Sequence, residues 1–122
     1  MTSDESSSAG DGVEFSQLEL LRILEQQPDI SQRELSRSLG LSLGKTHYVL
    51  HALLDKGLVK VGNFRRSDNK MAYVYLLTPA GVLAKMKMTR DFLSRKEAEF
   101  ERLRTTIAAL RAEVGNSSGD AA

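Results

Sequence analysis

Four side chains that can exchange hydrogen bonds with bases or phosphates stand close together near the middle of the chain: Lys45, His47, Tyr48 and His51. A lysine only donates hydrogen bonds, whereas a histidine ring or a tyrosine hydroxyl can donate or accept. Residues 42–54 include no Asp or Glu. A solvated helix face normally carries acids, so this pattern favours a surface that meets a polyanion. The alternative for each residue taken singly is an ordinary solvated helix position.

The charge distribution indicates the same kind of partner. The formal net charge is only +1, but residues 31–96 carry 13 basic against 4 acidic side chains. Residues 13–114 carry 17 basic against 12 acidic side chains. A surplus of this density favours nucleic acid, although a solvated basic surface would give the same count.

No catalytic set is evident, and we expect no enzyme activity. The chain has no Cys, which excludes disulfides, thiolate ligands and a thiol nucleophile. His47 and His51 have the spacing at which two histidines share a metal on one helix face, but no adjacent carboxylate or Cys completes a site. We therefore predict neither a metal nor a cofactor.

Two helices are predicted before residue 40. The first spans about residues 14–27, where apolar residues recur at helical spacing from Phe15 to Leu24 and Pro28 follows. The second begins at Ser31, which forms a capping box with Glu34, and ends at Gly40.

A third helix is predicted from the N-cap residue Ser42 to Lys56, with Gly57 after it. Its inward stripe includes Val49, Leu50 and Leu53, which leaves the hydrogen-bonding residues on the outside. Only one residue separates Gly40 from Ser42, so the second and third helices must meet at a sharp turn, as in a helix-turn-helix.

A β-hairpin follows, with strands predicted at residues 58–61 and 72–77. The intervening loop, Asn63–Lys70, is polar, and its basic residues are Arg65, Arg66 and Lys70. Arginines on such a loop suit the minor groove of DNA or its phosphates. We expect Phe64 to anchor the loop to the core.

A long helix then begins at Thr78-Pro79 and meets no Pro or Gly between residues 82 and 114. Its apolar residues repeat as a and d positions of a heptad, with Lys96 the one polar d position. We predict that this seam pairs two copies of the chain, the alternative being a helix that packs on its own chain. The predicted dimerisation residues are Leu93, Phe100, Leu103, Ile107, Leu110 and Val114.

The order of these elements predicts a mainly α fold with a small β-hairpin: a winged helix-turn-helix with a long C-terminal dimerisation helix. Residues 13–78 would form the DNA-binding domain and residues 79–114 the coiled coil. Residues 1–12 and 115–122 are polar and small, which predicts disordered tails. No apolar run approaches the roughly 18 residues that span a membrane, and we expect a cytoplasmic protein.

Residues 42–59, ending in Leu-Leu-Asp-Lys-Gly57-Leu-Val59, and the later Leu77-Thr-Pro-Ala-Gly81 resemble the MarR family of bacterial winged-helix regulators, in particular its exopolysaccharide-associated subgroup. The resemblance extends over about residues 18–114. It implies a homodimer that binds double-stranded DNA and controls exopolysaccharide biosynthesis genes. Larger members have helices on both sides of the winged domain with a ligand pocket between them; the short N-terminal part here puts a small-molecule effector in doubt.

The sequence thus predicts a DNA-binding transcriptional regulator that acts as a homodimer. The alternative is a winged-helix protein-interaction module that pairs through its C-terminal helix, because the fold alone does not fix the function. Arg33 and Arg37, one helical turn apart, are candidates for phosphate contacts. The predicted DNA-binding residues are Arg33, Ser42, Gly44, Lys45, His47, Tyr48, His51, Arg65, Arg66 and Lys70.

Overall fold

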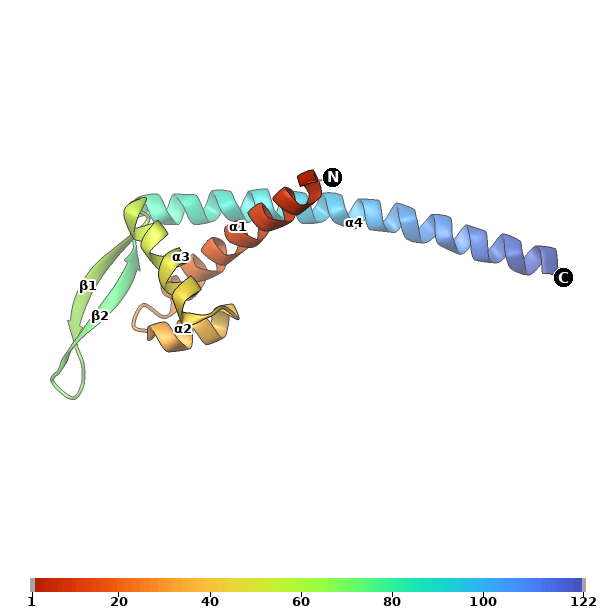
Figure 1. Cartoon of the computed structure of the whole chain (residues 1–122). Coiled ribbons are helices and arrows are strands. Elements are labelled where there is room, and N and C mark those ends of the chain that lie inside the picture. Colours follow the sequence, from red (N-terminus) through yellow and green to blue (C-terminus); the bar gives the residue numbers. More distant parts are fainter. Residues whose placement is uncertain (1, 122) are drawn as a thin grey trace. The chain divides into compact units, whose positions relative to one another are not determined.

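The computed structural model describes the backbone of residues 2–121 and the side chains of residues 12–117. Its elements are, in order, α1 (Thr2–Gln26), α2 (Gln32–Leu39), α3 (Leu43–Asp55), β1 (Val59–Arg65), β2 (Met71–Leu77) and α4 (Pro79–Ala121) (Figure 1). The chain divides into two compact units, Met1–Thr89 and Arg90–Ala122, and α4 contributes to both. The order of elements in the first unit is that of a winged helix-turn-helix. The predicted mainly α fold with a small β-hairpin and a long C-terminal helix is confirmed.

Local capping fixes the ends of α2 and α3 as the sequence predicted. The Ser31 hydroxyl accepts from the Glu34 amide and the Ser42 hydroxyl accepts from the Lys45 amide, each at 3.1 Å. Gly40 ends α2 with a φ of 68°. This left-handed conformation costs a residue with a Cβ about 1 kcal/mol or more. The chain therefore turns sharply between α2 and α3.

The core of the first unit lies where α1, α2 and α3 meet the hairpin. Its fully buried members include Leu21, Leu35, Leu50 and Leu53. The prediction for α1 was wrong in one respect: Phe15 is 43% exposed, while Leu20, which the sequence reasoning did not select, is fully buried.

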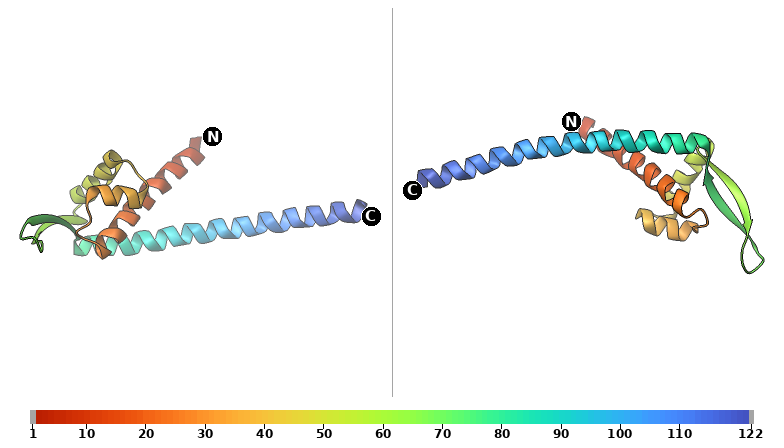
Figure 2. Two further views of the ribbon diagram at one scale, coloured as in Figure 1. Left: turned by 90° about the horizontal axis from the view of Figure 1, so that it is seen from below. Right: turned by 180° about the vertical axis from the view of Figure 1, so that it is seen from behind.

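The hairpin is antiparallel, with Val59 opposite Leu77 and Arg65 opposite Met71. In the views of Figure 2 it projects beyond α1, α2 and α3. The predicted loop, residues 63–70, is too long: β1 continues through Arg65, and only residues 66–70 connect the strands. Asn63, Phe64 and Arg65 pair with Tyr73, Ala72 and Met71 of β2, and this pairing extends the ladder through Arg65. Phe64 is half-buried there.

The first turn of α4 is bound to the end of α3. The Thr78 hydroxyl donates to the Gly57 carbonyl at 2.6 Å and accepts from the Gly81 amide at 3.0 Å. Later along α4, Lys85 forms an ion pair with Glu25 of α1. These bonds attach the start of the long helix to the winged unit.

The backbone differs from the predicted tails, since α1 begins at Thr2 and α4 ends at Ala121. The tails were predicted from their polar composition, which bears on how much surface a segment buries and does not by itself exclude a helix. The side chains of residues 1–11 and 118–122 lie outside the described part. The predicted domain boundaries stay predictions.

In the second unit, the six predicted seam residues are all exposed, from 39% for Ile107 to 67% for Val114. They lie on a helix that is regular through this region. Within the described residues, no helix is both long and apolar enough to span a membrane.

Candidate nucleic-acid interface

Helix α3 presents its polar residues on one side. The buried residues of α3 are Thr46, Val49, Leu50 and Leu53. Since successive residues of an α-helix are 100° apart, these four lie on one side of the helix, and the residues on the opposite side form its outward face. Gly44, Tyr48 and His51 lie at the centre of this outward face, with Lys45 and His47 at its two edges. All five residues are exposed, and Tyr48 retains 75% of its surface.

The start of α3 is held by two serine and threonine contacts. Besides the cap from Ser42, the hydroxyl of fully buried Thr46 donates to the Ser42 carbonyl at 2.9 Å. The buried hydroxyl is thereby satisfied, which avoids a cost of about 1–3 kcal/mol. The first turn, with its free amides and the exposed residues Gly44 and Lys45, is consequently fixed relative to the core.

His47 lies at the end of a chain of contacts that reaches the hairpin. Its Nδ1 is 3.5 Å from Oε1 of Gln32, whose amide nitrogen donates to the Tyr75 hydroxyl at 3.3 Å. The His47 and His51 rings are tilted, with centroids 4.1 Å apart. Sequence reasoning missed Gln32 and Tyr75. The capping box placed Gln32 at the start of α2, but only the packing of α2 on α3 brings it to His47.

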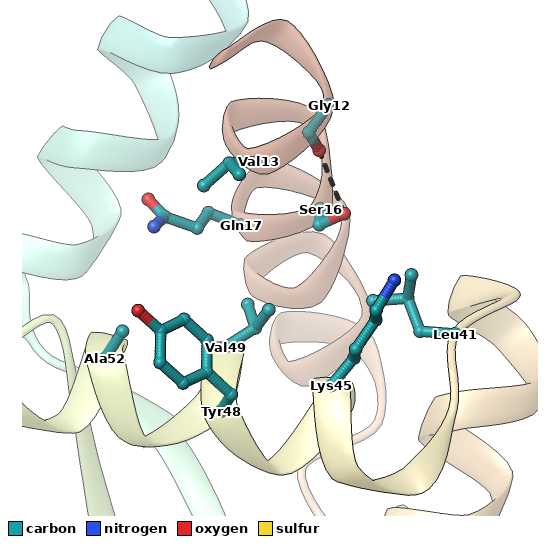
Figure 3. Close-up of a pocket in the computed structure, with 9 residues that line it drawn as sticks. All are labelled: Gly12, Val13, Ser16, Gln17, Leu41, Lys45, Tyr48, Val49 and Ala52. Carbon is teal, nitrogen blue, oxygen red and sulfur yellow. Dashed lines mark hydrogen bonds between the residues drawn. The ribbon is translucent and has the colours of Figure 1, made fainter. Parts of the chain in front are cut away.

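Lys45 and Tyr48 also border a groove of about 450 Å³ between α1 and α3. Figure 3 shows them on the α3 side of it, opposite Val13 and Gln17 of α1. The groove walls are mostly apolar, with Val49 at their base. The aliphatic part of Lys45 and the Tyr48 ring therefore have apolar neighbours while their polar ends remain accessible to a ligand of α3.

The three predicted basic residues of the hairpin all lie at or beside its turn. Arg65 donates to the side-chain oxygen of Asn69 at 3.0 Å, and Arg66 is 3.8 Å from Asp68. Both arginines and Lys70 are exposed. The contacts within the turn restrict the arginines without burying their charge.

The remaining predicted residue, Arg33, is exposed on α2, as is Arg37. The predicted residues are thus distributed over α2, α3 and the hairpin of one compact unit. Contact of these residues with DNA stays a prediction. Among the described residues, no group of three His, Cys, Asp or Glu is arranged to hold a metal ion.

Comparison with known proteins supports the fold. Residues 16–60 match the family model for a winged helix-turn-helix DNA-binding domain. That segment includes α2, α3 and the start of β1, and therefore most of the predicted interface. None of the curated proteins matches the sequence.

Solved structures of similar fold are bacterial regulators. The multiple antibiotic-resistance repressor MarR from Listeria monocytogenes is 19% identical with a TM-score of 0.51, over 88% of this chain and 87% of that one. MepR, a transcription regulator of the Staphylococcus aureus multidrug efflux pump MepA, is 16% identical with a TM-score of 0.52, over 81% and 78%.

FabT from Streptococcus pneumoniae, solved in complex with DNA, is 20% identical with a TM-score of 0.49. The alignment includes 70% of this chain, which spans 58% of the length of FabT. At the identities found for MarR and MepR, what the chain shares with those two structures is the winged helix-turn-helix fold.

Proposed function

We propose that the protein is a sequence-specific DNA-binding transcriptional regulator that acts as a homodimer. The observation that carries the proposal is the N-terminal part of the outward face of α3, where five exposed residues from Gly44 to His51 include hydrogen-bonding groups and no acid. The acid on this face, Asp55, lies at the C-terminal end of α3, one turn beyond His51. The major groove of DNA admits an α-helix and offers base-edge donors and acceptors to such groups. A match of residues 16–60 to the winged helix-turn-helix DNA-binding model supports the same assignment.

Within this proposal, the centre of the outward face reads the bases. Gly44 has no side chain and no neighbour within 4 Å of where one would stand, so the backbone of α3 can approach the duplex closely there. Tyr48 lies one helical turn after Gly44, and His51 lies one turn after Tyr48. Both side chains can reach base edges. Lys45 donates to guanine or to phosphate, and the free amides behind Ser42 suit a phosphate oxygen.

The hairpin and α2 supply contacts to the DNA backbone. Arg65, Arg66 and Lys70 carry positive charge at the hairpin turn and would enter the minor groove or meet its phosphates. Arg33 would contact phosphate from α2. Such contacts position a protein on DNA and strengthen binding to any sequence, and they make binding sensitive to salt.

The exposed seam of α4 supports a homodimer. Six large apolar side chains are exposed along one stripe of α4. We expect a second helix to cover such a stripe. A two-fold symmetric dimer would bind an inverted repeat whose half-sites are about one helical turn or a multiple apart. The resemblance of residues 42–59 and 77–81 to exopolysaccharide-associated regulators supports genes for surface polysaccharide as its targets.

DNA binding by the full chain to its own upstream region, measured by fluorescence anisotropy at about 150 mM salt, tests the proposal. We expect Lys45→Ala and Tyr48→Ala to lower the ratio of specific to random-DNA affinity roughly 5- to 100-fold. Arg65→Ala should instead weaken binding to both DNAs and reduce the salt slope by about 1. Lys87→Ala, which removes an exposed lysine of α4, is the matched control and should change neither quantity.

Two outcomes would contradict the proposal. The first is binding to the upstream region no tighter than to random DNA, since nonspecific binding is already weak at this salt concentration. The second is an equal loss of specificity in Lys45→Ala, Tyr48→Ala and Arg65→Ala. That result would contradict the assignment of base contacts to α3 and of backbone contacts to the hairpin. A folded protein that ignores both DNAs would favour the protein-interaction module.

A further inference from the structure

We infer that the seam of α4 pairs with a second copy of this chain as a parallel, in-register two-stranded coiled coil. The inference rests on the homodimer of the proposed function and adds the direction of its helices. The seam residues and the charged residues that flank them all lie in the second unit, Arg90–Ala122.

The seam has the residue types of a parallel pair at its C-terminal end. Ile107 and Val114 are β-branched and occupy a positions, while Leu103 and Leu110 occupy d positions. β-Branched residues at a with leucine at d favour two parallel strands, because the two kinds of layer present side chains to the partner at different angles. All four residues are exposed and available to a partner.

The flanking charges are complementary in the parallel arrangement. A parallel pair places each g residue against the e residue of the next heptad in the partner, so Glu99 faces Arg104 of the second copy, and the reverse. The next such contact joins Thr106 to Arg111. Arg104 lies 3.5 Å from Glu101 of its own chain, but both side chains are about two-thirds exposed, so Arg104 can exchange this partner.

Antiparallel pairing brings like charges together, because e then faces e and g faces g. A pair centred near residue 98 opposes Glu97 to Glu97 and Glu99 to Glu99. A pair centred near residue 105 opposes Arg104 to Arg104. The best antiparallel register is centred between residues 101 and 102. It pairs Glu97 with Arg104, but it opposes Arg90 to Arg111.

Lys96 gives the parallel pair one unfavourable layer, because the Lys96 side chains of the two copies would meet at a d position. The Lys96 ammonium lies 3.2 Å from Glu99 of its own chain. Glu97 follows at the adjoining e position, so the two lysines of the layer would be accompanied by four carboxylates. A single polar layer of this kind lowers stability but fixes the register of a coiled coil. In the best antiparallel register, Lys96 would instead face Ile107 in two separate layers.

Disulfide trapping in the full chain tests the direction, and the absence of native Cys makes every disulfide assignable. A disulfide needs Cα atoms within about 7 Å, which a symmetric layer provides and opposite ends of a helix do not. We expect Leu110→Cys alone to form a covalent dimer in good yield under mild oxidation. Ala112→Cys, on the outer face of the same helix, is the matched control and should form at least tenfold less.

Light scattering of the reduced, full-length protein distinguishes failure of the homodimer from failure of the parallel direction. A monomer would refute the homodimer of the proposed function and with it this inference. A dimer in which Leu110→Cys does not cross-link, but a mixture of Leu93→Cys and Leu110→Cys chains does, would overturn the parallel direction alone. A dimer that cross-links in neither case would show that the seam is not its interface, and would also overturn the inference.

Charge reversal gives a second readout. Glu99→Lys should weaken the parallel dimer roughly two- to tenfold, and adding Arg104→Glu in the same chain should restore part of the loss. The part that is not restored reflects the contact of Glu99 with Lys96. In the best antiparallel register Glu99 faces Thr106 and Arg104 faces Glu97, so the second substitution would weaken the dimer further. Failure of the double variant to recover would therefore count against the parallel pair.

Discussion

Replacement of Gly81 by alanine is expected to destabilise the winged unit, although Gly81 lies in a helix. A Cβ at this position would stand 3.0 Å from the carbonyl carbon of Leu58 and well inside van der Waals contact with its oxygen. That oxygen cannot move freely, because it accepts a hydrogen bond from the Thr78 amide at 3.0 Å. The first turn of α4 and the start of the hairpin would have to separate.

Three contributions set the magnitude. Overpacking costs about 1–3 kcal/mol, and the loss of the bond from Thr78 to Leu58 costs about 0.5–1.5 kcal/mol. The helix propensity of alanine over glycine returns about 0.5–1 kcal/mol. The net loss is about 0.5–4 kcal/mol, and its midpoint of about 2 kcal/mol lowers Tm by roughly 8–16 °C for a folded unit of this size.

Thermal unfolding followed by circular dichroism measures this shift, at one fixed protein concentration because a dimer melts in a concentration-dependent way. The matched control is Gly44→Ala, the same substitution in α3, where a Cβ would meet nothing within 4 Å. We expect the control to raise Tm by a few degrees, since alanine is favoured in a helix. A Gly81→Ala protein that melts with the wild type would refute the close approach to Leu58 and the reasoning built on it.

The remaining predictions concern the cap of α4 and the face of α3. Thr78→Val should lower the free energy of unfolding by about 1–2 kcal/mol, because it removes the hydroxyl that bonds to Gly57 and Gly81. Thr78→Ser, which keeps the hydroxyl, should retain most of the wild-type stability. Equal urea midpoints for the two variants would contradict this prediction. Gly44→Ala should weaken specific DNA binding by at least threefold in anisotropy titrations despite its higher Tm. Unchanged affinity would place Gly44 away from the duplex.

The sequence predicted well those features that depend on neighbouring residues. The Ser31 and Ser42 caps, the left-handed Gly40 and the inward stripe of α3 each follow from contacts within about four residues along the chain. The short connection after Gly40 then leaves little choice for the angle between α2 and α3. For this reason the exposed position of Lys45 could be predicted before any packing was known.

Features that depend on packing between elements were predicted less well. Helical spacing alone did not distinguish Phe15, which is partly exposed, from Leu20, which is buried. Which apolar residues of α1 are buried depends on where α2 and α3 contact it, and the spacing of apolar residues does not contain that information. The hairpin loop was overestimated for a related reason: residues 63–65 pair with β2 across the hairpin, and the pattern along the sequence does not contain that contact.

The position of His47 shows how far a residue of the proposed interface depends on distant parts of the chain. Gln32 is 15 residues before it, and Tyr75 is 43 residues after Gln32. Together they connect the outward face of α3 with β2, so the orientation of one imidazole is tied to the placement of the hairpin. A pattern read along the sequence selects His47 as a DNA-facing residue, but it does not contain the partners that orient it. The orientation of His47 in the proposed interface therefore depends on the packing of α2 and β2 as well as on the residues of α3.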